Sequence, residues 1–183
     1  MDGKQIIAVI GSGTMGNGIA HVSALSGYLV FLVDINNELL EKAIHKISTN
    51  MQKQADKGTI SEEQKATALN AITTTTDMSD VKNADLVIEA APENQSIKNE
   101  IFANLDSICK PEAILASNTS SISITDLGVQ TNREDKVIGM HFMNPVPIMK
   151  LVEVVNGSNT SVETKTTIIE FAKNMDKIPV ECN

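Results

Sequence analysis

The segment IIAVIGSGTMGNGIA, which begins at Ile6, restricts the possible folds of this chain more than any other feature. An unbroken apolar run, Ile6–Ile10, is followed at once by Gly11, Gly13 and Gly16 and then by a helix-forming stretch. In this Gly-x-Gly-x-x-Gly spacing, Gly11 allows a tight turn, Gly13 lets a pyrophosphate approach the backbone, and Gly16 lets the helix pack closely on the strand. The free N–H groups and positive dipole end of the helix suit the same anion. The segment therefore predicts a strand–turn–helix unit that binds a dinucleotide.

The neighbours of these glycines and the end of the next apolar run indicate which dinucleotide to expect. Ser12, Thr14 and Met15 stand among the glycines, and we assign them to the same cofactor-binding loop. Asp34 ends the second apolar run, close to the spacing of about 20 residues at which an acidic residue binds a ribose 2′-hydroxyl. No arginine follows Asp34 to receive a 2′-phosphate, so NAD is favoured over NADP. The alternatives are an ordinary strand–helix turn and, for Asp34, a surface carboxylate before a helix.

Short apolar runs alternate with helical patterns along the chain. The runs that predict strands are Ile6–Ile10, Leu29–Val33, Ile72–Thr76, Leu86–Glu89, Ala113–Ala116, Val137–Phe142 and Leu151–Val155. Most of the early runs are apolar throughout, as expected of parallel strands buried on both faces. Helical spacing follows the second run as far as Gly58, and Ser61 with Gln64 forms a capping-box signature for another helix. We therefore predict an α/β fold: a Rossmann-like, doubly wound, mostly parallel sheet with a helical-hairpin insertion after the second strand.

Length, charge and cysteine content narrow the class of protein further. At 183 residues the chain suits one domain, and we predict that residues 1–183 form a single NAD-binding domain. A net charge of −8 without a basic face argues against nucleic acid as a partner, and no apolar run approaches the roughly 20 residues of a membrane helix. Cys109 and Cys182 lack metal-ligand spacing, which predicts free thiols, no metal site and a reducing, cytoplasmic location. A strand pattern opens at Ile178, just before the chain ends, so we expect a piece of a longer protein.

Four longer segments resemble the 3-hydroxyacyl-CoA dehydrogenases, including the bacterial 3-hydroxybutyryl-CoA dehydrogenases. The segments are GSGTMGNGIA, VIEAAPENQSIKNEIF, ASNTSS and GMHFMNPVPIMKLVEVV, in that order. They are spread over most of the chain, from the first predicted strand to residue 155. The resemblance implies hydride transfer between NAD and the C3 hydroxyl or keto carbon of an (S)-3-hydroxyacyl-CoA such as 3-hydroxybutyryl-CoA, in fatty-acid metabolism.

His141, near the end of a late strand, is the candidate catalytic base. Oxidising a secondary alcohol with NAD requires a base, and imidazole has the ordinary pKa closest to that task. Glu153 lies in an apolar run, where a carboxylate is destabilising unless a group such as an imidazolium pairs with it. The resemblance implies that His141 is the base, that Glu153 orients and charges it, and that Ser120 hydrogen-bonds the reacting oxygen. The alternatives are a core histidine beside a solvated glutamate and a helix cap at Ser120. The other histidines, His21 and His45, lie in helix patterns without an acidic partner, which favours structural or surface roles.

The resemblance also assigns cofactor and substrate contacts. It implies that Glu93, Lys98 and Asn144 lie at the nicotinamide side of NAD and that Lys57 contacts coenzyme A. The alternative for Lys98 is an exposed helix residue. Asn50 stands where some members of the family carry a serine contact, which weakens the coenzyme A assignment.

In the resembled family, a helical C-terminal domain completes the substrate site. It supplies an asparagine that polarises the thioester side of the substrate, and it forms the dimer. We expect that domain to be absent from this chain, the full-length protein to be a homodimer through it, and the chain alone to be nearly inactive on acyl-CoA. Two other functions agree less well with the sequence. A β-hydroxyacid dehydrogenase acting on a free acid would use a lysine base, which the pair of His141 and Glu153 argues against. A non-catalytic NAD-binding protein would not need His141, Glu153 and Ser120 intact.

Overall fold

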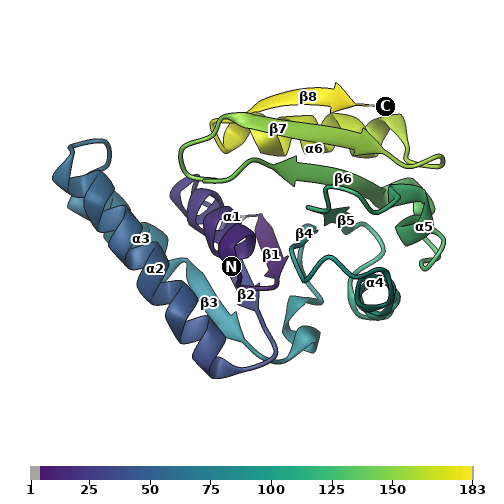
Figure 1. Ribbon diagram of the computed structural model, residues 1–183, viewed down its shortest axis with the longest axis horizontal. Coiled ribbons are helices and arrows are strands. Elements are labelled where there is room, and N and C mark those ends of the chain that lie inside the picture. The colour runs from purple at the N-terminus through teal and green to yellow at the C-terminus, as the bar shows by residue number, and fades with distance from the viewer. Residues whose placement is uncertain (1–4, 183) are drawn as a thin grey trace.

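The chain builds one eight-stranded sheet, which the computed structural model describes within residues 5–182 (Figure 1). The strands are β1 (Ile6–Ile10), β2 (Leu29–Val33), β3 (Ile72–Thr75), β4 (Leu86–Glu89), β5 (Ile114–Ser117), β6 (Val137–Phe142), β7 (Leu151–Asn156) and β8 (Ile178–Cys182). Their order across the sheet is β3-β2-β1-β4-β5-β6-β7-β8. In this order, neighbouring strands from β3 through β2, β1, β4 and β5 to β6 are parallel. Strand β7 is antiparallel to β6, and β8 is parallel to β7. The sheet extends in opposite directions from β1 and β4, so the predicted doubly wound, Rossmann-like fold is confirmed.

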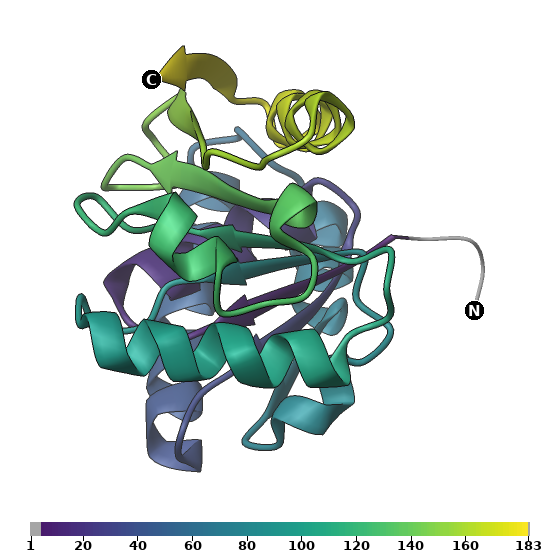
Figure 2. The same ribbon diagram turned by 90° about the vertical axis from the view of Figure 1, so that its right-hand side faces the viewer.

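Helices cover both faces of this sheet (Figures 1 and 2). They are α1 (Thr14–Leu25), α2 (Asn37–Asp56), α3 (Glu62–Asn70), α4 (Gln95–Ile108), α5 (Ile124–Gly128) and α6 (Val162–Asn174), with short 3-10 turns η1 (Met78–Val81) and η2 (Glu134–Lys136). One core cluster joins α1, α2 and α6 to the sheet, and a second joins α4 and α5 to it. Because both faces of β1 and β4 are buried in this way, their side chains are apolar almost throughout.

The predicted helical hairpin between β2 and β3 is confirmed by α2 and α3, which pack against each other. Helix α2 begins where the Asn36 side chain accepts a hydrogen bond from the Leu39 N–H, and it ends before Gly58, whose φ of 70° suits glycine. The capping box of Ser61 and Gln64 at the start of α3 is present with both reciprocal hydrogen bonds. Each such N-cap contributes about 1 kcal/mol to helix stability.

Some strand boundaries differ from those expected from sequence. The fifth strand is shifted by one residue, because Ser117 continues the pairing with β6 opposite Gly139. The strand pattern that opens at Ile178 forms β8, and Pro179 is tolerated there because β8 is an edge strand. Within residues 5–182, no helix is both long enough and apolar enough to cross a membrane.

Both cysteines carry free thiols, as predicted. Cys109 is buried in the core cluster beneath α4, and this burial raises the pKa of its thiol to about 11. The Cys109 thiol is therefore protonated and unreactive at neutral pH.

Candidate active site

The glycine turn between β1 and α1 has the geometry that its sequence predicts. Gly11 has a φ of 95°, and a Cβ atom on it would lie 2.7 Å from the carbonyl oxygen of Ala90. A Cβ atom on Gly16 would lie 1.7 Å from the carbonyl oxygen of Gly11, so α1 packs directly on the turn. At Gly13 a Cβ atom would meet nothing within 4 Å, and no side chain caps the helix there. The first N–H groups of α1 therefore adjoin open space in which a pyrophosphate fits.

Asp34 lies beside this turn because β2 pairs with β1 in parallel, so the carboxyl ends of the two strands meet. Its Oδ2 accepts hydrogen bonds from the Ser12 backbone N–H (2.7 Å) and the Ser12 hydroxyl (2.6 Å). Its Oδ1 accepts one from the Ile35 N–H (2.7 Å). A carboxylate has about four acceptor positions, so Asp34 is oriented by the turn and keeps capacity for a ligand hydroxyl.

A groove of about 860 Å³ runs past the glycine turn and Asp34 towards the start of α4. It is lined by residues 11–15 and 90–92, by Asp34, and by Leu39, Lys42, Lys46, Ile97 and Ile101 among others. Its volume falls in the range of small-molecule and cofactor sites, about 300–1,000 Å³. Lys42 and Lys46 were not assigned from sequence, because basic residues on an amphipathic helix resemble an ordinary solvated face.

His141 and Glu153 face each other across β6 and β7, where they are a directly opposed antiparallel pair. The distance from His141 Nδ1 to Glu153 Oε2 is 2.7 Å, and the side chains are 23% and 35% exposed. Because a carboxylate only accepts hydrogen bonds, Nδ1 carries the proton, and Nε2 of the neutral ring keeps its lone pair. The strand β6 ends one residue later, and a cis peptide bond joins Asn144 to Pro145 in the following turn. The structure thus brings together the two residues that the sequence paired.

A hollow of about 290 Å³ lies beside His141. It is lined by Met15, Ala90, Ala91, Glu93, Lys98, Asn118, Ser120, His141, Phe142, Met143 and Asn144. Met15, Ala90 and Ala91 also line the groove of the glycine turn, so the hollow continues that groove. The candidate site therefore has Asp34 towards one end and His141 with Ser120 at the other.

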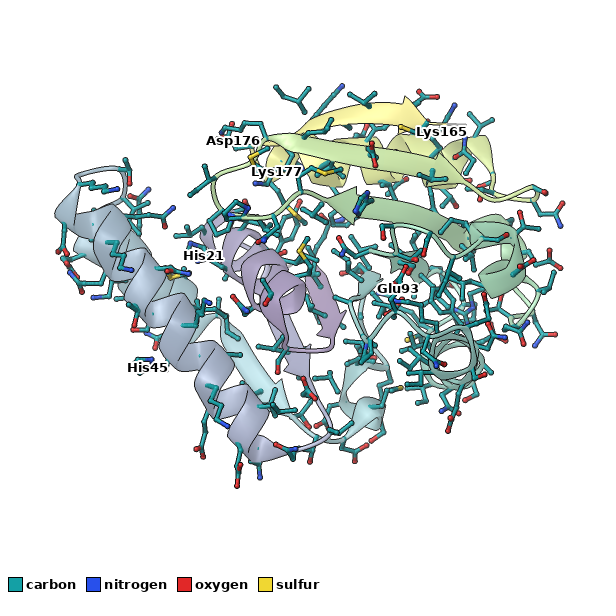
Figure 3. The ribbon with its side chains drawn as sticks, viewed as in Figure 1. His21, His45, Glu93, Lys165, Asp176 and Lys177 are labelled. Atoms are coloured by element: carbon teal, nitrogen blue, oxygen red, sulfur yellow. The ribbon has the colours of Figure 1, made fainter. Side chains whose placement is uncertain are left out.

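Glu93, which is labelled in Figure 3, makes the hydrogen bonds that fix the loop carrying Ser120. Its Oε1 accepts hydrogen bonds from the hydroxyls of Thr119 and Ser121 (2.9 Å for Ser121) and from the Ser120 N–H (3.3 Å). Burial opposes ionisation of Glu93, but these hydrogen bonds and the charge of Lys98 outweigh it and hold its pKa below the ordinary value. Glu93 is therefore an ionised carboxylate at neutral pH.

Lys98 is not the exposed helix residue that the alternative prediction described, since it is only 1% exposed. Its Nζ lies 2.6 Å from Glu89 Oε1, 3.3 Å from the Ala91 carbonyl oxygen and 3.4 Å from Glu93 Oε2. Glu89 ends β4, is fully buried, and also accepts hydrogen bonds from the Ser117 hydroxyl and the Ala91 N–H, both at 2.6 Å. Sequence reasoning missed Glu89. An acidic residue that ends an apolar strand was the available signal, because a buried carboxylate requires a partner.

Asn118 is a second residue of the hollow that sequence reasoning missed. Its side-chain Oδ1 accepts a hydrogen bond from the Phe142 N–H (2.8 Å). Phe142 directly follows His141, so Asn118 ties the loop after β5 to the strand that carries the candidate base.

Lys57 lies at the C-cap of α2, in a cleft of about 490 Å³. Asn50 and residues 144–148 line the same cleft. Asn144 also lines the hollow beside His141, so the two cavities adjoin.

The remaining histidines agree with the structural and surface roles predicted for them (Figure 3). His21 is buried in α1, and its Nε2 lies 2.9 Å from Gln54 Oε1. Burial lowers the pKa of His21; this effect is larger than the opposing effect of the hydrogen bond with Gln54, and the charge of Lys177 lowers the pKa slightly further. His45 is exposed on α2.

Comparison with known sequences identifies proteins similar to this chain. The chain is 45% identical over 183 residues to a probable 3-hydroxybutyryl-CoA dehydrogenase of Bacillus subtilis, covering 100% of this chain and 63% of that protein. It is 46% identical to a 3-hydroxybutyryl-CoA dehydrogenase of Clostridioides difficile, covering 96% of this chain and 62% of that protein. The chain thus spans a little over three fifths of the length of these two relatives.

Solved structures and the family assignment agree with the sequence relatives. The crystal structure of a 3-hydroxybutyryl-CoA dehydrogenase from Escherichia coli K12 superposes with a TM-score of 0.96 at 42% identity, covering 98% of this chain and 38% of that one. The (S)-3-hydroxybutyryl-CoA dehydrogenase of Ralstonia eutropha gives 0.95 at 41% identity, covering 97% and 63%. Residues 6–183 match the family described as 3-hydroxyacyl-CoA dehydrogenase, NAD binding domain. The chain belongs to this family, and its cofactor is NAD.

Proposed function

We propose that this chain carries the NAD-binding and base-bearing part of an enzyme that transfers a hydride between NAD and C3 of an (S)-3-hydroxyacyl-CoA such as 3-hydroxybutyryl-CoA. The observation that carries the proposal is the 2.7 Å pair of His141 and Glu153 at the end of the cofactor groove. The names of the relatives, which are 3-hydroxybutyryl-CoA dehydrogenases, support the same reaction.

The proposed chemistry begins with the proton of the substrate hydroxyl. NAD, when bound, supplies the carbon that accepts the hydride. His141 Nε2 takes the hydroxyl proton, and the carboxylate of Glu153 stabilises the resulting imidazolium through its hydrogen bond with Nδ1–H. Ser120 lines the same hollow, and its hydroxyl donates a hydrogen bond to the reacting oxygen.

The residues that line the groove and the hollow would hold the cofactor. Residues 11–15 line the groove and, with Gly16, would hold the pyrophosphate, and Asp34 would accept a hydrogen bond from the ribose hydroxyl. Glu93, Lys98 and Asn144 line the hollow where the nicotinamide end would lie. Lys57, in the adjoining cleft, supplies a positive charge to coenzyme A.

The organisation of the complete protein is a separate proposal. We infer that the described residues form one NAD-binding unit, because a single sheet runs through all of them. A homodimer formed through a helical domain, a cytoplasmic location and a role in fatty-acid metabolism remain predictions. Analytical ultracentrifugation of the full-length protein checks the first of these.

The test compares His141→Ala with the unaltered full-length protein in the reduction of acetoacetyl-CoA by NADH. We expect kcat to fall by about 10²–10⁴, the usual contribution of a general base, with little change in the Kd of NADH. His45→Ala is the matched control, because His45 is exposed on α2, and it should keep the original kcat. Turnover of free acetoacetate at the rate of the CoA ester, or full activity of His141→Ala, would contradict the proposal.

A further inference from the structure

A buried charged network lies below the hollow, and its innermost residue, Glu89, has no role in the proposed chemistry. It joins Glu89 in the core to Lys98 and then to Glu93, at Nζ–O distances of 2.6 Å and 3.4 Å. Glu89 and Lys98 are 0% and 1% exposed, whereas the Glu93 side chain is 41% exposed at the hollow. An ion pair buried this deeply contributes little net stability, because the cost of desolvating both charges offsets their attraction. Stability alone therefore does not explain the pair of Glu89 and Lys98.

The Lys98 ammonium is held from the core side. It donates hydrogen bonds to Glu89 Oε1 and the Ala91 carbonyl oxygen, and Glu93 Oε2 lies 3.4 Å away without a hydrogen bond. Glu89 is itself held by the Ser117 hydroxyl and the Ala91 N–H. Lys98 is thus fixed between Glu89 in the core and Glu93 at the hollow.

Glu93 uses its two oxygens differently. Oε1 accepts the hydrogen bonds from Thr119, Ser120 and Ser121. Oε2 faces Lys98 at 3.4 Å, and within residues 5–182 it accepts no hydrogen bond. One charged oxygen at the wall of the hollow therefore retains capacity for a ligand donor.

We propose that Glu89 is a positioning residue for the nicotinamide end of the site: it holds Lys98 inside the protein as the anchor of Glu93, whose Oε2 is the acceptor presented to the cofactor. This inference rests on the proposed function, because it takes the hollow beside His141 as the nicotinamide end. Lys98 lies between two carboxylates, so the network of Glu89, Lys98 and Glu93 keeps one net negative charge. This net charge favours the nicotinamide ring of NAD⁺, which is positively charged, over that of NADH.

The network can be tested by the affinities of the 183-residue chain for NAD⁺ and NADH, measured by calorimetry and by NADH fluorescence. In Glu89→Gln, the amide oxygen can still accept the hydrogen bond from the Ala91 N–H. The negative charge of residue 89 is lost, so that, within the network, Lys98 is left with Glu93 as its one carboxylate partner. The charge of Glu93 is then offset, and we expect the preference for NAD⁺ over NADH to fall by about fivefold. In Glu89→Gln/Lys98→Met both charges of the pair are removed. We expect the preference to return to within about twofold of the original, while both affinities weaken in parallel by about threefold or more, because Glu93 has lost its anchor.

The matched control is Asp85→Asn/Lys110→Met, which removes a second lysine–carboxylate pair. Asp85 directly precedes β4 and Glu89 ends it, so the two pairs lie at opposite ends of one strand. This control should leave both affinities unchanged.

If Glu89→Gln does not fold, the double variant Glu89→Gln/Lys98→Met decides. The inference would be overturned if Glu89→Gln folds and keeps the original preference for NAD⁺ over NADH. It would also be overturned if Glu89→Gln/Lys98→Met folds and either keeps both affinities or changes this preference. An unaltered chain that binds neither cofactor would instead refute the proposed function.

Discussion

The strongest test of the site is Glu153→Gln in the full-length protein, because this change removes a charge and preserves the shape of the side chain. In the structure, Glu153 Oε2 lies 2.7 Å from His141 Nδ1. An amide at this position still accepts the hydrogen bond from Nδ1 and keeps the ring oriented. What is lost is the attraction between the carboxylate and the imidazolium that forms as the proton is transferred.

The magnitude follows from the geometry and the exposure of the pair. At a charge separation of about 4 Å, an effective dielectric constant of about 20 gives roughly 4 kcal/mol. The side chains are 23% and 35% exposed, so screening by water reduces this to about 2 kcal/mol. A loss of about 2 kcal/mol of transition-state stabilisation corresponds to a decrease in kcat of about 30-fold.

The assay is the oxidation of (S)-3-hydroxybutyryl-CoA by NAD⁺, followed across a range of pH, with Glu181→Gln as control. Glu181, on the neighbouring strand β8, makes an exposed ion pair with Lys165 of α6, and its removal should change kcat by less than about twofold. For Glu153→Gln we also expect the acid limb of the oxidation profile to move to lower pH, because the protonated imidazole has lost its counter-ion. A kcat within about twofold of the original at every pH would show that the carboxylate does not assist the base.

Three further predictions concern the cofactor turn and stability. NAD should bind about 10- to 100-fold more tightly than NADP, because Asp34 would lose a charge-assisted hydrogen bond and repel the 2′-phosphate; equal affinities by calorimetry would refute its role. Gly16→Ala should destabilise the fold by about 3 kcal/mol or more in urea denaturation, because its Cβ would lie 1.7 Å from a carbonyl oxygen, whereas Gly13→Ala, with open space around it, should keep its stability and weaken only NAD binding. The pKa of Asp106 is below its ordinary value, because hydrogen bonds and the charge of Arg133 outweigh burial. Its contribution is therefore present at neutral pH and lost as the pH falls through that lowered pKa, so Asp106→Asn should cost stability at pH 7 and little in strong acid, and an equal cost at both would contradict this.

The strand runs, the glycine turn and the acidic residue after β2 could be predicted from sequence because each depends on residues that are close together in the chain. A run such as Leu86–Glu89 is apolar throughout only if both faces of the strand are covered, so burial on both sides is already visible in the pattern. Gly11 and Gly16 are needed for the backbone that immediately surrounds them. The pairing of His141 with Glu153 was predictable for a related reason, since a carboxylate inside an apolar strand requires a nearby partner.

The hydrogen bonds and ion pairs between segments distant in the sequence were decided only by the tertiary structure. Lys98 looks like a solvated helix residue in the sequence, and it is buried because the order of the strands brings Glu89 of β4 and Ser117 of β5 beneath α4. The hydrogen bond from Phe142 to Asn118 exists because β6 pairs with β5. Ser12 meets the carboxylate of Asp34 for the same reason, through the parallel pairing of β1 and β2. Local patterns record which side chains must be buried, whereas the partner that satisfies a buried polar group depends on which strands become neighbours, and that is a property of the whole sheet.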